Sequence, residues 1–263
     1  MLINGMLTNA EIWHHLLISE TEEFERIDRS LLCRLLRMPR TIPRPALYLE
    51  FGLLPLSIVI KKRRLNYLHN ILRSPELGML NRVFVVQWHF PSKGDWTLQV
   101  KQDLIDFDLP QDLNIIRSKS KEVFKRLVKE RATKFAFNEL CKKKLTYSKL
   151  VKLEYNELKV QNYLLDSDTS FEDKRLIFMF RTRMANFWGN FKGNRPETLC
   201  PLCGEHIDCQ SLILQCPKVR QQLEGKIDLN QLTTIEDIFW ENISERTFMI
   251  VKTALDARSK LEQ

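Results

Sequence analysis

The sequence contains few glycines and lacks the glycine-rich motifs that bind phosphate groups. Eight of the 263 residues are glycine, about 3% against an average near 7%. The patterns GxGxxG, GxSxG and GxxxxGK followed by Ser or Thr do not occur. These patterns mark dinucleotide-binding loops, hydrolase nucleophile turns and P-loops. Their absence argues against a nucleotide-binding enzyme, and the scarcity of glycine argues against a fold built from repeated hairpin turns.

Long apolar runs and an export signal are also missing. The longest apolar stretch, residues 53–60, is interrupted by Pro55 and Ser57, and it is far shorter than the ~20 residues of a transmembrane helix. The first ten residues contain neither a basic segment nor a convincing apolar segment of a signal peptide. We therefore expect an intracellular protein, nuclear or cytoplasmic, that does not enter a membrane.

The positive charge is concentrated in one stretch of the chain. The 41 Lys and Arg outnumber the 33 Asp and Glu, which gives a net charge of +8. Residues 117–144 hold eleven basic residues and three Glu, a net of +8, so the rest of the chain sums to zero. Such a concentration predicts salt-dependent, mostly sequence-independent contacts with the phosphates of RNA or DNA. A merely solvated helix face is the alternative.

Several basic residues are candidates for phosphate contacts. Lys121, Lys125 and Lys129 recur every four residues, which places them about 6 Å apart along one face of a helix. A second basic group closes the same stretch, and two arginines precede the cysteine cluster. These further candidates are Lys142, Lys143, Lys144, Arg181 and Arg183.

Apolar periodicity predicts a mainly α-helical, multi-helical fold. A capping box at residues 19–22 opens the first helix, which continues to Leu35. Pro45 is placed to open a short helix, and Ser118 or Ser120 caps the basic helix. Further helices are expected over residues 55–73, 77–90, 96–107, 121–144, 152–164, 171–186, 235–241 and 244–261. We expect region boundaries that give residues 1–92, 93–195, 196–222 and 223–263, the first of them at the loop Pro91-Ser92-Lys93-Gly94.

Four of the six cysteines fall within seventeen residues: Cys200, Cys203, Cys209 and Cys216. In a reducing compartment such a cluster more often binds a metal than forms disulfides. The turn Cys200-Pro-Leu-Cys203-Gly directs two thiolates at one centre, and Cys216 is a third donor. Structural Zn²⁺ takes four Cys or His ligands, so either Cys209 or His206 is needed as the fourth. We expect a structural zinc that stabilises a segment too small for its own core; loosely clustered buried thiols or a decayed site are the alternative.

These motifs together resemble part of the reverse transcriptases of non-LTR retrotransposons. The cysteine cluster, preceded by Phe180-Arg-Thr-Arg-Met and Asn190-Phe-Lys-Gly-Asn, resembles their zinc knuckle. Residues 1–13, 32–39, 46–50, 53–56, 62–65 and 67–69 resemble the palm exit, the thumb and the connecting helices, and residues 94–96 and 118–122 resemble the following linker. The resemblance implies a thumb-like helical bundle, a basic helical linker and a small zinc knuckle.

The resemblance also has consequences for individual residues. In such a thumb the segment with Arg63 and Arg64 would face a primer–template duplex, so both arginines are candidates for phosphate contacts. The family knuckle has a His four residues before its last Cys, and Leu212 occupies that position here. This departure favours Cys209 over His206 as the fourth zinc ligand, and it leaves weakened metal binding open as an alternative.

No catalytic centre is expected. The palm of these polymerases holds two divalent metals on adjacent carboxylates, and the sequence has no Asp-Asp pair. We therefore expect a non-enzymatic fragment that binds RNA or DNA, with a full-length reverse transcriptase as a second candidate partner. Two alternatives are a helical remnant that docks on a polymerase or host protein through helices near residues 31–36 and 58–72, and a decayed element copy without selected function.

Overall fold

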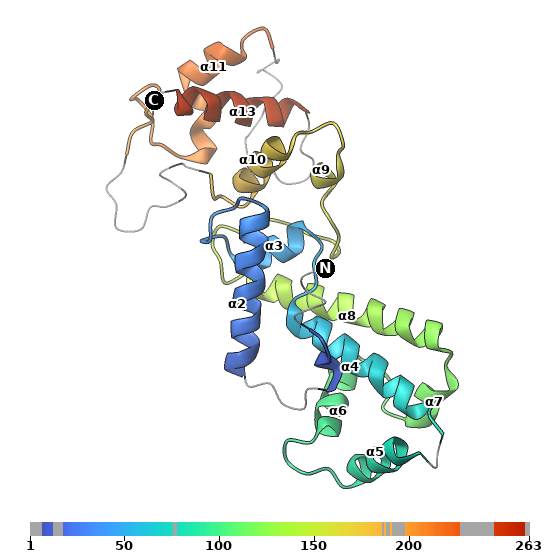
Figure 1. Ribbon diagram of the computed structural model, residues 1–263. Coiled ribbons are helices and arrows are strands. Elements are labelled where there is room, and N and C mark those ends of the chain that lie inside the picture. The colour runs from blue at the N-terminus through green and yellow to red at the C-terminus, as the bar shows by residue number, and fades with distance from the viewer. Residues whose placement is uncertain are drawn as a thin grey trace. The chain divides into compact units, whose positions relative to one another are not determined.

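The computed structural model describes residues 7–12, 18–75, 78–185, 187, 190, 198–226 and 245–260. Over these residues the chain is helical and has no strand within a sheet (Figure 1). Two isolated antiparallel bridges, Phe51 with Val160 and Leu199 with Ile207, are the extended pairings found there. The prediction of a mainly α-helical, multi-helical protein is confirmed.

The chain divides into two compact units. Unit 1 comprises residues 1–35 and 52–141, and unit 2 comprises residues 36–51 and 142–263. The predicted boundaries after residues 92, 195 and 222 do not coincide with this division. The loop after residue 90 closes a helical hairpin inside unit 1, and the cysteine segment shares its core with the C-terminal helix inside unit 2.

Unit 1 is built around one central helix. Its elements are η1 (Ala10–Ile12), α2 (Ile18–Leu35), α4 (Leu56–Leu72), α5 (Met79–His89), α6 (Trp96–Asp106), α7 (Leu113–Ser118) and α8 (Lys121–Lys144), of which the last three residues belong to unit 2. Helix α4 contacts η1, α2, α5, α6 and α7. The sequence patterns predict most of these helices but not α7.

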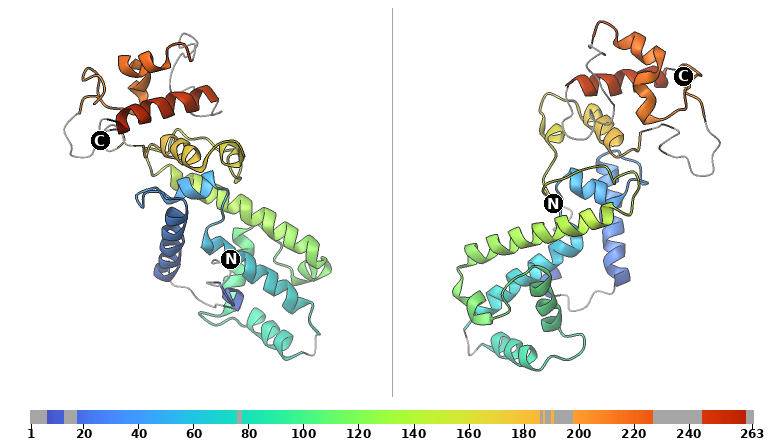
Figure 2. Two further views of the ribbon diagram at one scale, coloured as in Figure 1. Left: turned by 45° about the horizontal axis from the view of Figure 1, so that its top comes forward. Right: turned by 180° about the vertical axis from the view of Figure 1, so that it is seen from behind.

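Helices α4 and α8 run side by side (Figure 2). The ring of His69 on α4 stacks on Phe124 of α8 with centroids 4.8 Å apart, and the His69 Nε2 lies 3.0 Å from the Lys119 carbonyl oxygen. The Ser120 hydroxyl accepts a hydrogen bond from the Val123 N–H at 3.3 Å, which is the predicted cap of the basic helix. These contacts fix which face of α8 is buried and which is exposed.

Unit 2 contains shorter elements. They are α3 (Arg44–Glu50), α9 (Asn162–Leu165), α10 (Phe171–Arg181), η3 (Gln210–Gln215), α11 (Pro217–Leu223) and α13 (Glu245–Ser259). Helix α10 ends earlier than predicted, and Arg183 just after it has a φ of 55°. The predicted helix over residues 235–241 lies outside the described residues.

The predicted helix over residues 152–164 is wrong for most of its length, because tertiary hydrogen bonds hold this segment in an irregular path. The carboxylate of fully buried Glu50 accepts hydrogen bonds from the hydroxyl groups of Tyr155, at 2.6 Å, and Tyr163, at 2.8 Å. The Gln161 N–H donates to the Glu50 carbonyl oxygen at 3.0 Å. The chain from 150 to 161 thus wraps around the end of α3, and these partners outweigh its local helix propensity.

Candidate metal centre and candidate nucleic-acid interface

The cysteine segment begins as a short hairpin with a tight turn at its tip. Leu199 pairs with Ile207, and the Cys200 N–H donates to the His206 carbonyl oxygen at 2.7 Å. The Gly204 N–H donates back to the Cys200 carbonyl oxygen at 2.8 Å. Gly204 has a φ of +68°, a left-handed conformation that glycine adopts without a steric penalty. The turn therefore depends on Gly204, as the sequence pattern predicts.

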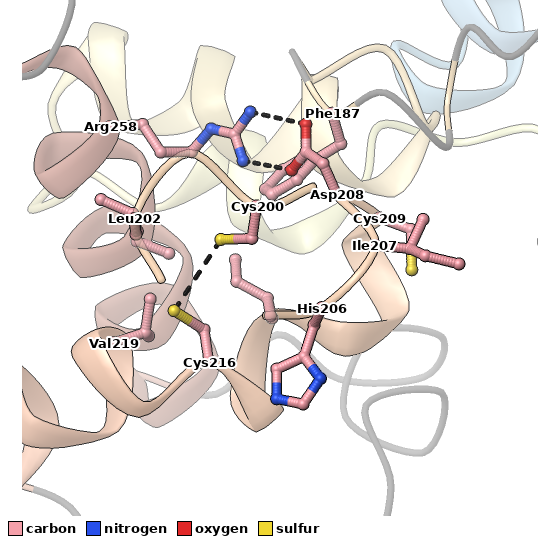
Figure 3. A pocket seen from close by; sticks show the side chains of 12 residues that line it. Phe187, Cys200, Leu202, His206, Ile207, Asp208, Cys209, Cys216, Val219 and Arg258 are labelled. Atoms are coloured by element: carbon pink, nitrogen blue, oxygen red, sulfur yellow. Dashed lines mark hydrogen bonds and ion pairs between the residues drawn. The ribbon is translucent and has the colours of Figure 1, made fainter. Parts of the chain in front are cut away.

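Three sulfur atoms converge at this turn, and Figure 3 shows two of them, those of Cys200 and Cys216. The Sγ atoms of Cys200, Cys203 and Cys216 lie within 4.8 Å of one another, and those of Cys200 and Cys216 are 3.9 Å apart. Cys216 reaches them because it lies between η3 and α11, as the N-cap residue of α11. Zn–S bonds of about 2.3 Å in a tetrahedron place two sulfurs about 3.8 Å apart. The three thiols therefore fit a metal ion of this size.

Backbone N–H groups lower the pKa of two of these thiols, but burial outweighs them at Cys216. Burial acts to raise the pKa of the Cys203 thiol, but hydrogen bonds from the N–H groups of Glu205 and His206 and from the neighbouring thiols lower it below its usual range. Burial, together with the Cys200 charge, raises the pKa of Cys216 to about 11, although the N–H groups of Val219 and Lys218 act in the opposite direction. A bound cation would offset the repulsion between adjacent thiolates.

Cys209 does not join the three sulfurs, so the structure does not bring the predicted four-cysteine set together. Its backbone is extended, with φ −137° and ψ 154°, and its N–H donates to the Ile207 carbonyl oxygen at 2.9 Å. Figure 3 shows its sulfur directed away from Cys200 and Cys216. The spacing of cysteines gives their separation along the chain but not the direction of each side chain.

Neither alternative fourth position completes the set. His206 holds the turn through its carbonyl oxygen, and among the described residues its ring is not part of the converging group. Leu212 lies in η3, and its side chain is outside the described part of the chain. The described donors are thus three cysteines that can hold a metal ion, and the metal's identity is not fixed by them.

The centre is attached to a core that local sequence reasoning missed. Cys200 and Cys216 pack in a buried cluster with Phe187 and with residues of α10, η3, α11 and α13: Phe180, Ile213, Val219, Leu223, Ile250, Val251 and Ala254. Arg258 of α13 forms an ion pair with buried Asp208, and its guanidinium lies 4.6 Å from the centre of the Phe187 ring. Asp208 and Arg258 are 50 residues apart, and no local motif links them.

The basic row of α8 lies on an exposed face. Lys121, Lys125 and Lys129 are all exposed, whereas Phe124, Val128 and Ala132 on the opposite side are fully buried. Within the part of the chain that the structure describes, none of the three lysines forms an ion pair. These lysines are therefore placed as the sequence predicts, with their charges toward solvent.

A lysine of α4 adds to the same surface. Lys62 is half-buried, and burial lowers its pKa, with further lowering by the like charges of Lys129 and Arg63. Positive groups from two helices thus lie close enough to repel one another. An anion placed between them would relieve this repulsion. We define the α4–α8 basic surface as Lys62, Lys121, Lys125 and Lys129.

The two arginines predicted from the thumb resemblance are engaged inside unit 1. Arg64 is buried, and its Nε lies 3.1 Å from Oδ2 of buried Asp103. The Arg63 Nη1 donates to the Leu7 carbonyl oxygen at 2.5 Å. The prediction that Arg64 contacts phosphate is therefore corrected, because its charge faces a carboxylate in the core.

Asp103 has an unusual titration that follows from this burial. Burial raises the pKa of Asp103 from 3.8 to about 6, against the opposing effects of Arg64 and Lys61. The Arg64 Nε and the Asp103 Oδ2 make no aligned hydrogen bond among the described residues, so their contact compensates the buried charge incompletely. Between these pKa values the folded state holds a proton that the unfolded state has lost.

We expect the Asp103 carboxyl to titrate near pH 6, measured by carbon NMR. The protonated Asp103 carboxyl stabilises the folded protein, and this stabilisation is fully present below about pH 4. It is lost as the pH rises through 6, and the free energy of unfolding then falls by up to about 3 kcal/mol. The free energy of unfolding of the wild type should therefore fall relative to that of Asp103→Asn between pH 4 and pH 7. A midpoint below 4 would contradict this assignment.

The remaining predicted basic residues divide by exposure. Lys142 and Lys143 are exposed, whereas Lys144 is buried, where its Nζ donates to the carbonyl oxygens of Leu153 and Val151. The prediction that Lys144 contacts phosphate is corrected, because its buried ammonium group donates to these two carbonyl oxygens of the turn after α8.

The arginines before the cysteine cluster are also placed inward. Arg181 is buried and its Nε donates to the Glu50 carboxylate at 3.0 Å, so its predicted phosphate contact is corrected as well. Arg183 is half-buried at the left-handed residue after α10. The segment 180–184 that carries the resemblance therefore contributes mainly to the interior of unit 2.

Comparisons of the chain with protein-family models, with curated proteins and with solved structures found no match. The resemblance to retrotransposon reverse transcriptases thus continues to rest on the sequence motifs alone. Among the described residues, no helix is both long and apolar enough to span a membrane.

Proposed function

We propose that this protein is a non-catalytic nucleic-acid-binding protein that contacts RNA or DNA phosphates through the α4–α8 basic surface. The observation that carries the proposal is the exposed row of Lys121, Lys125 and Lys129, which has no ion-paired acid within the described residues. Its members lie one helical turn apart, so successive phosphates of one strand are within reach of successive lysines. Lys142 and Lys143 are retained as further candidates because they are exposed.

A row of exposed lysines on a rigid helix suits the recognition of a polyanion better than the recognition of a folded acidic protein. Each lysine that neutralises a phosphate releases condensed counterions, and this release drives binding without base contacts. The buried partners of Arg64, Lys144 and Arg181 restrict the candidate surface to fewer residues than the sequence suggests. Binding should therefore be weak at high salt and largely indifferent to sequence.

The cysteine centre has a structural role in this proposal. Cys200, Cys203 and Cys216 hold a zinc ion, which stabilises the hairpin and the helices packed on it. Soft thiolate donors favour Zn²⁺ over Mg²⁺ or Ca²⁺. In this proposal the chain is related to the thumb-to-knuckle region of a non-LTR retrotransposon reverse transcriptase. A full-length reverse transcriptase of this kind is also a candidate partner.

The alternative of a docking remnant has two candidate surfaces: near residues 31–36, where Leu35 is 67% exposed, it stays a prediction, and helix α4 gives it no support. Ile58, Leu65, Leu68 and Leu72 on α4 are all buried. This helix is the centre of unit 1 and does not present an apolar face.

The proposal is tested by fluorescence anisotropy with labelled single-stranded and duplex oligonucleotides. We expect binding at low salt that weakens steeply as salt rises. The triple variant K121E/K125E/K129E should lower the affinity at least tenfold and reduce the slope of log K against log salt by about 3, since three phosphate contacts are lost.

A matched control has the same change in net charge. The variant K152E/K159E/K226E alters three exposed lysines of unit 2 that are outside the proposed surface, and it should retain the salt slope. Equal losses in the two variants would show that only net charge matters. Absence of binding at low salt, or binding insensitive to salt, would overturn the proposal.

A further inference from the structure

Among the described residues of unit 1, helix α5 is held by one of its sides. The buried Asn81 side chain donates to the carbonyl oxygens of Ile71 and Ser74, each at 3.5 Å. On the same side, the ring of buried Phe84 lies 6.3 Å from that of Trp96 on α6. The orientation of α5 about its axis is therefore fixed, and its other side faces away from the unit 1 core.

The opposite side of α5 is an exposed apolar stripe, which we call the α5 stripe: Met79, Val83, Val86 and Phe90. Their exposed fractions are 82%, 47%, 60% and 80%. The separations are four, three and four residues, which at about 100° per residue place all four side chains within an arc of roughly 60°. Phe90 follows the last helical residue, and its N–H still donates to the Val86 carbonyl oxygen at 2.9 Å.

This stripe is not explained by nucleic-acid binding. Helix α5 contains one charged side chain, Arg82, and apolar residues on both of its sides. A helix that is apolar all round is normally covered on both sides. A contiguous exposed stripe of large apolar side chains marks a surface that another element covers.

We propose that the α5 stripe pairs with the α5 stripe of a second copy of this chain, the two helices running antiparallel about a twofold axis. The carrying observation is that the spacing of the stripe reads the same in both directions. A twofold axis midway between Phe84 and Val85 places Met79 against Phe90 of the other copy, and Val83 against Val86. All four side chains of the α5 stripe are matched at once, as an isologous interface requires, while Leu80 and Val85, which are 49% and 41% exposed, lie outside its arc.

The charges of α5 are compatible with this pairing. The axis places Arg82 level with Gln87 of the other copy, about 7.5 Å along the helix from the second Arg82. The alternating spacing of four and three residues is that of a coiled-coil interface, in which a β-branched side chain packs between side chains of the facing helix. A membrane-surface helix would instead carry a row of Lys or Arg beside its apolar side, and α5 has a single arginine.

The size of the stripe sets the expected strength. The four side chains expose on the order of 500 Å² per copy, so pairing buries on the order of 1,000 Å² in total, the lower limit for a specific interface. We therefore expect a reversible dimer with a dissociation constant of about 10–100 μM. A dimer presents two α4–α8 basic surfaces, which would raise the avidity for a long nucleic acid.

Sedimentation equilibrium over about 5–500 μM tests the proposal at a constant moderate salt concentration. The wild type should dimerise, and V83E or V86K alone should raise the dissociation constant at least tenfold. The double variant V83E/V86K should regain the dimer, because in the antiparallel register each V83E carboxylate faces a V86K ammonium of the other copy. Circular dichroism checks that all variants are folded, which is expected since both valines are exposed.

Ile105→Glu is the matched control, since Ile105 on α6 is a β-branched residue with 53% exposure. It should leave the dimer unchanged. A wild type that stays monomeric to the highest concentration would overturn the proposal, and so would a dimer that V83E does not weaken. If the double variant did not regain the dimer, the antiparallel register would be excluded. If the monomer bound anionic vesicles through the α5 stripe, the stripe would be a lipid-binding surface and the dimer proposal would be overturned.

Discussion

Replacement of Glu50 by alanine is expected to destabilise unit 2 by about 3–5 kcal/mol, because it leaves the buried Arg181 guanidinium without its counter-charge. Glu50 is fully buried, and its carboxylate receives hydrogen bonds from Arg181, Tyr155 and Tyr163. All of its strong acceptor positions are thus in use. Burial, together with the charge of Glu50, raises the pKa of both tyrosines well above their usual range, so the phenols stay neutral donors.

Hydrogen exchange measured by mass spectrometry would locate this effect. The amides of α3 and α10 should exchange faster in Glu50→Ala, while those of α4 in unit 1 should be unaffected. Tyr163→Phe removes one hydrogen bond to a charged group and should cost about 1.5–3 kcal/mol. The double variant E50L/R181M removes both charges and should be less destabilised than Glu50→Ala. Equal exchange in wild type and Glu50→Ala would contradict the interpretation.

Substitution of Cys216 by serine is expected to abolish zinc binding, because it removes a direct ligand. The loss of affinity should exceed about 100-fold, since removal of a group that only hydrogen-bonds to a ligand already costs about 10–100-fold. Cys216 brings α11 to the hairpin, and its sulfur lies 3.9 Å from that of Cys200. Chelator competition and metal analysis measure the affinity and stoichiometry, with one zinc per chain expected for the wild type. Chelation should also speed exchange in α11 and α13, since their core includes two of the ligands.

Cys209→Ser provides the matched control for this prediction. It makes the same chemical change seven residues earlier, at a thiol directed away from the centre (Figure 3). It should keep zinc binding within a few-fold of the wild type. If Cys209→Ser and Cys216→Ser lost zinc equally, the assignment of three ligands would be wrong and the four-cysteine set would be restored.

Features that depend on neighbouring residues are predictable from the sequence. The bounds of α8 follow from its cap and its apolar stripe, and the turn at Cys200 and Cys203 follows from local spacing with Gly204. Exposure of the lysine row follows from the same periodicity. Each of these features depends on residues within a few turns of one another.

The errors concern charged residues whose partners are far away in the sequence. Arg181 resembles a surface arginine until Glu50, 131 residues earlier, is placed beside it. Arg64 and Asp103 meet in the same way on α4 and α6. Lys144 is drawn inward by carbonyl groups of the following turn. No periodicity or composition argument indicates such pairings, because a single buried carboxylate has no local signature.

The interrupted make-up of unit 2 has a consequence for how the protein is produced. Residues 36–51 leave the ribosome long before the segments with which they pack, since the partners of Glu50 follow 105 to 131 residues later. At 5–20 residues per second this delay is roughly 5–25 s. For that time the apolar residues of α3 have no partner, while the residues of unit 1 on either side are already available to fold. A chaperone that shields short apolar helices during translation would thus act on α3 first, and a ribosome stalled before residue 181 would release a chain whose first unit is complete and whose second unit has only begun.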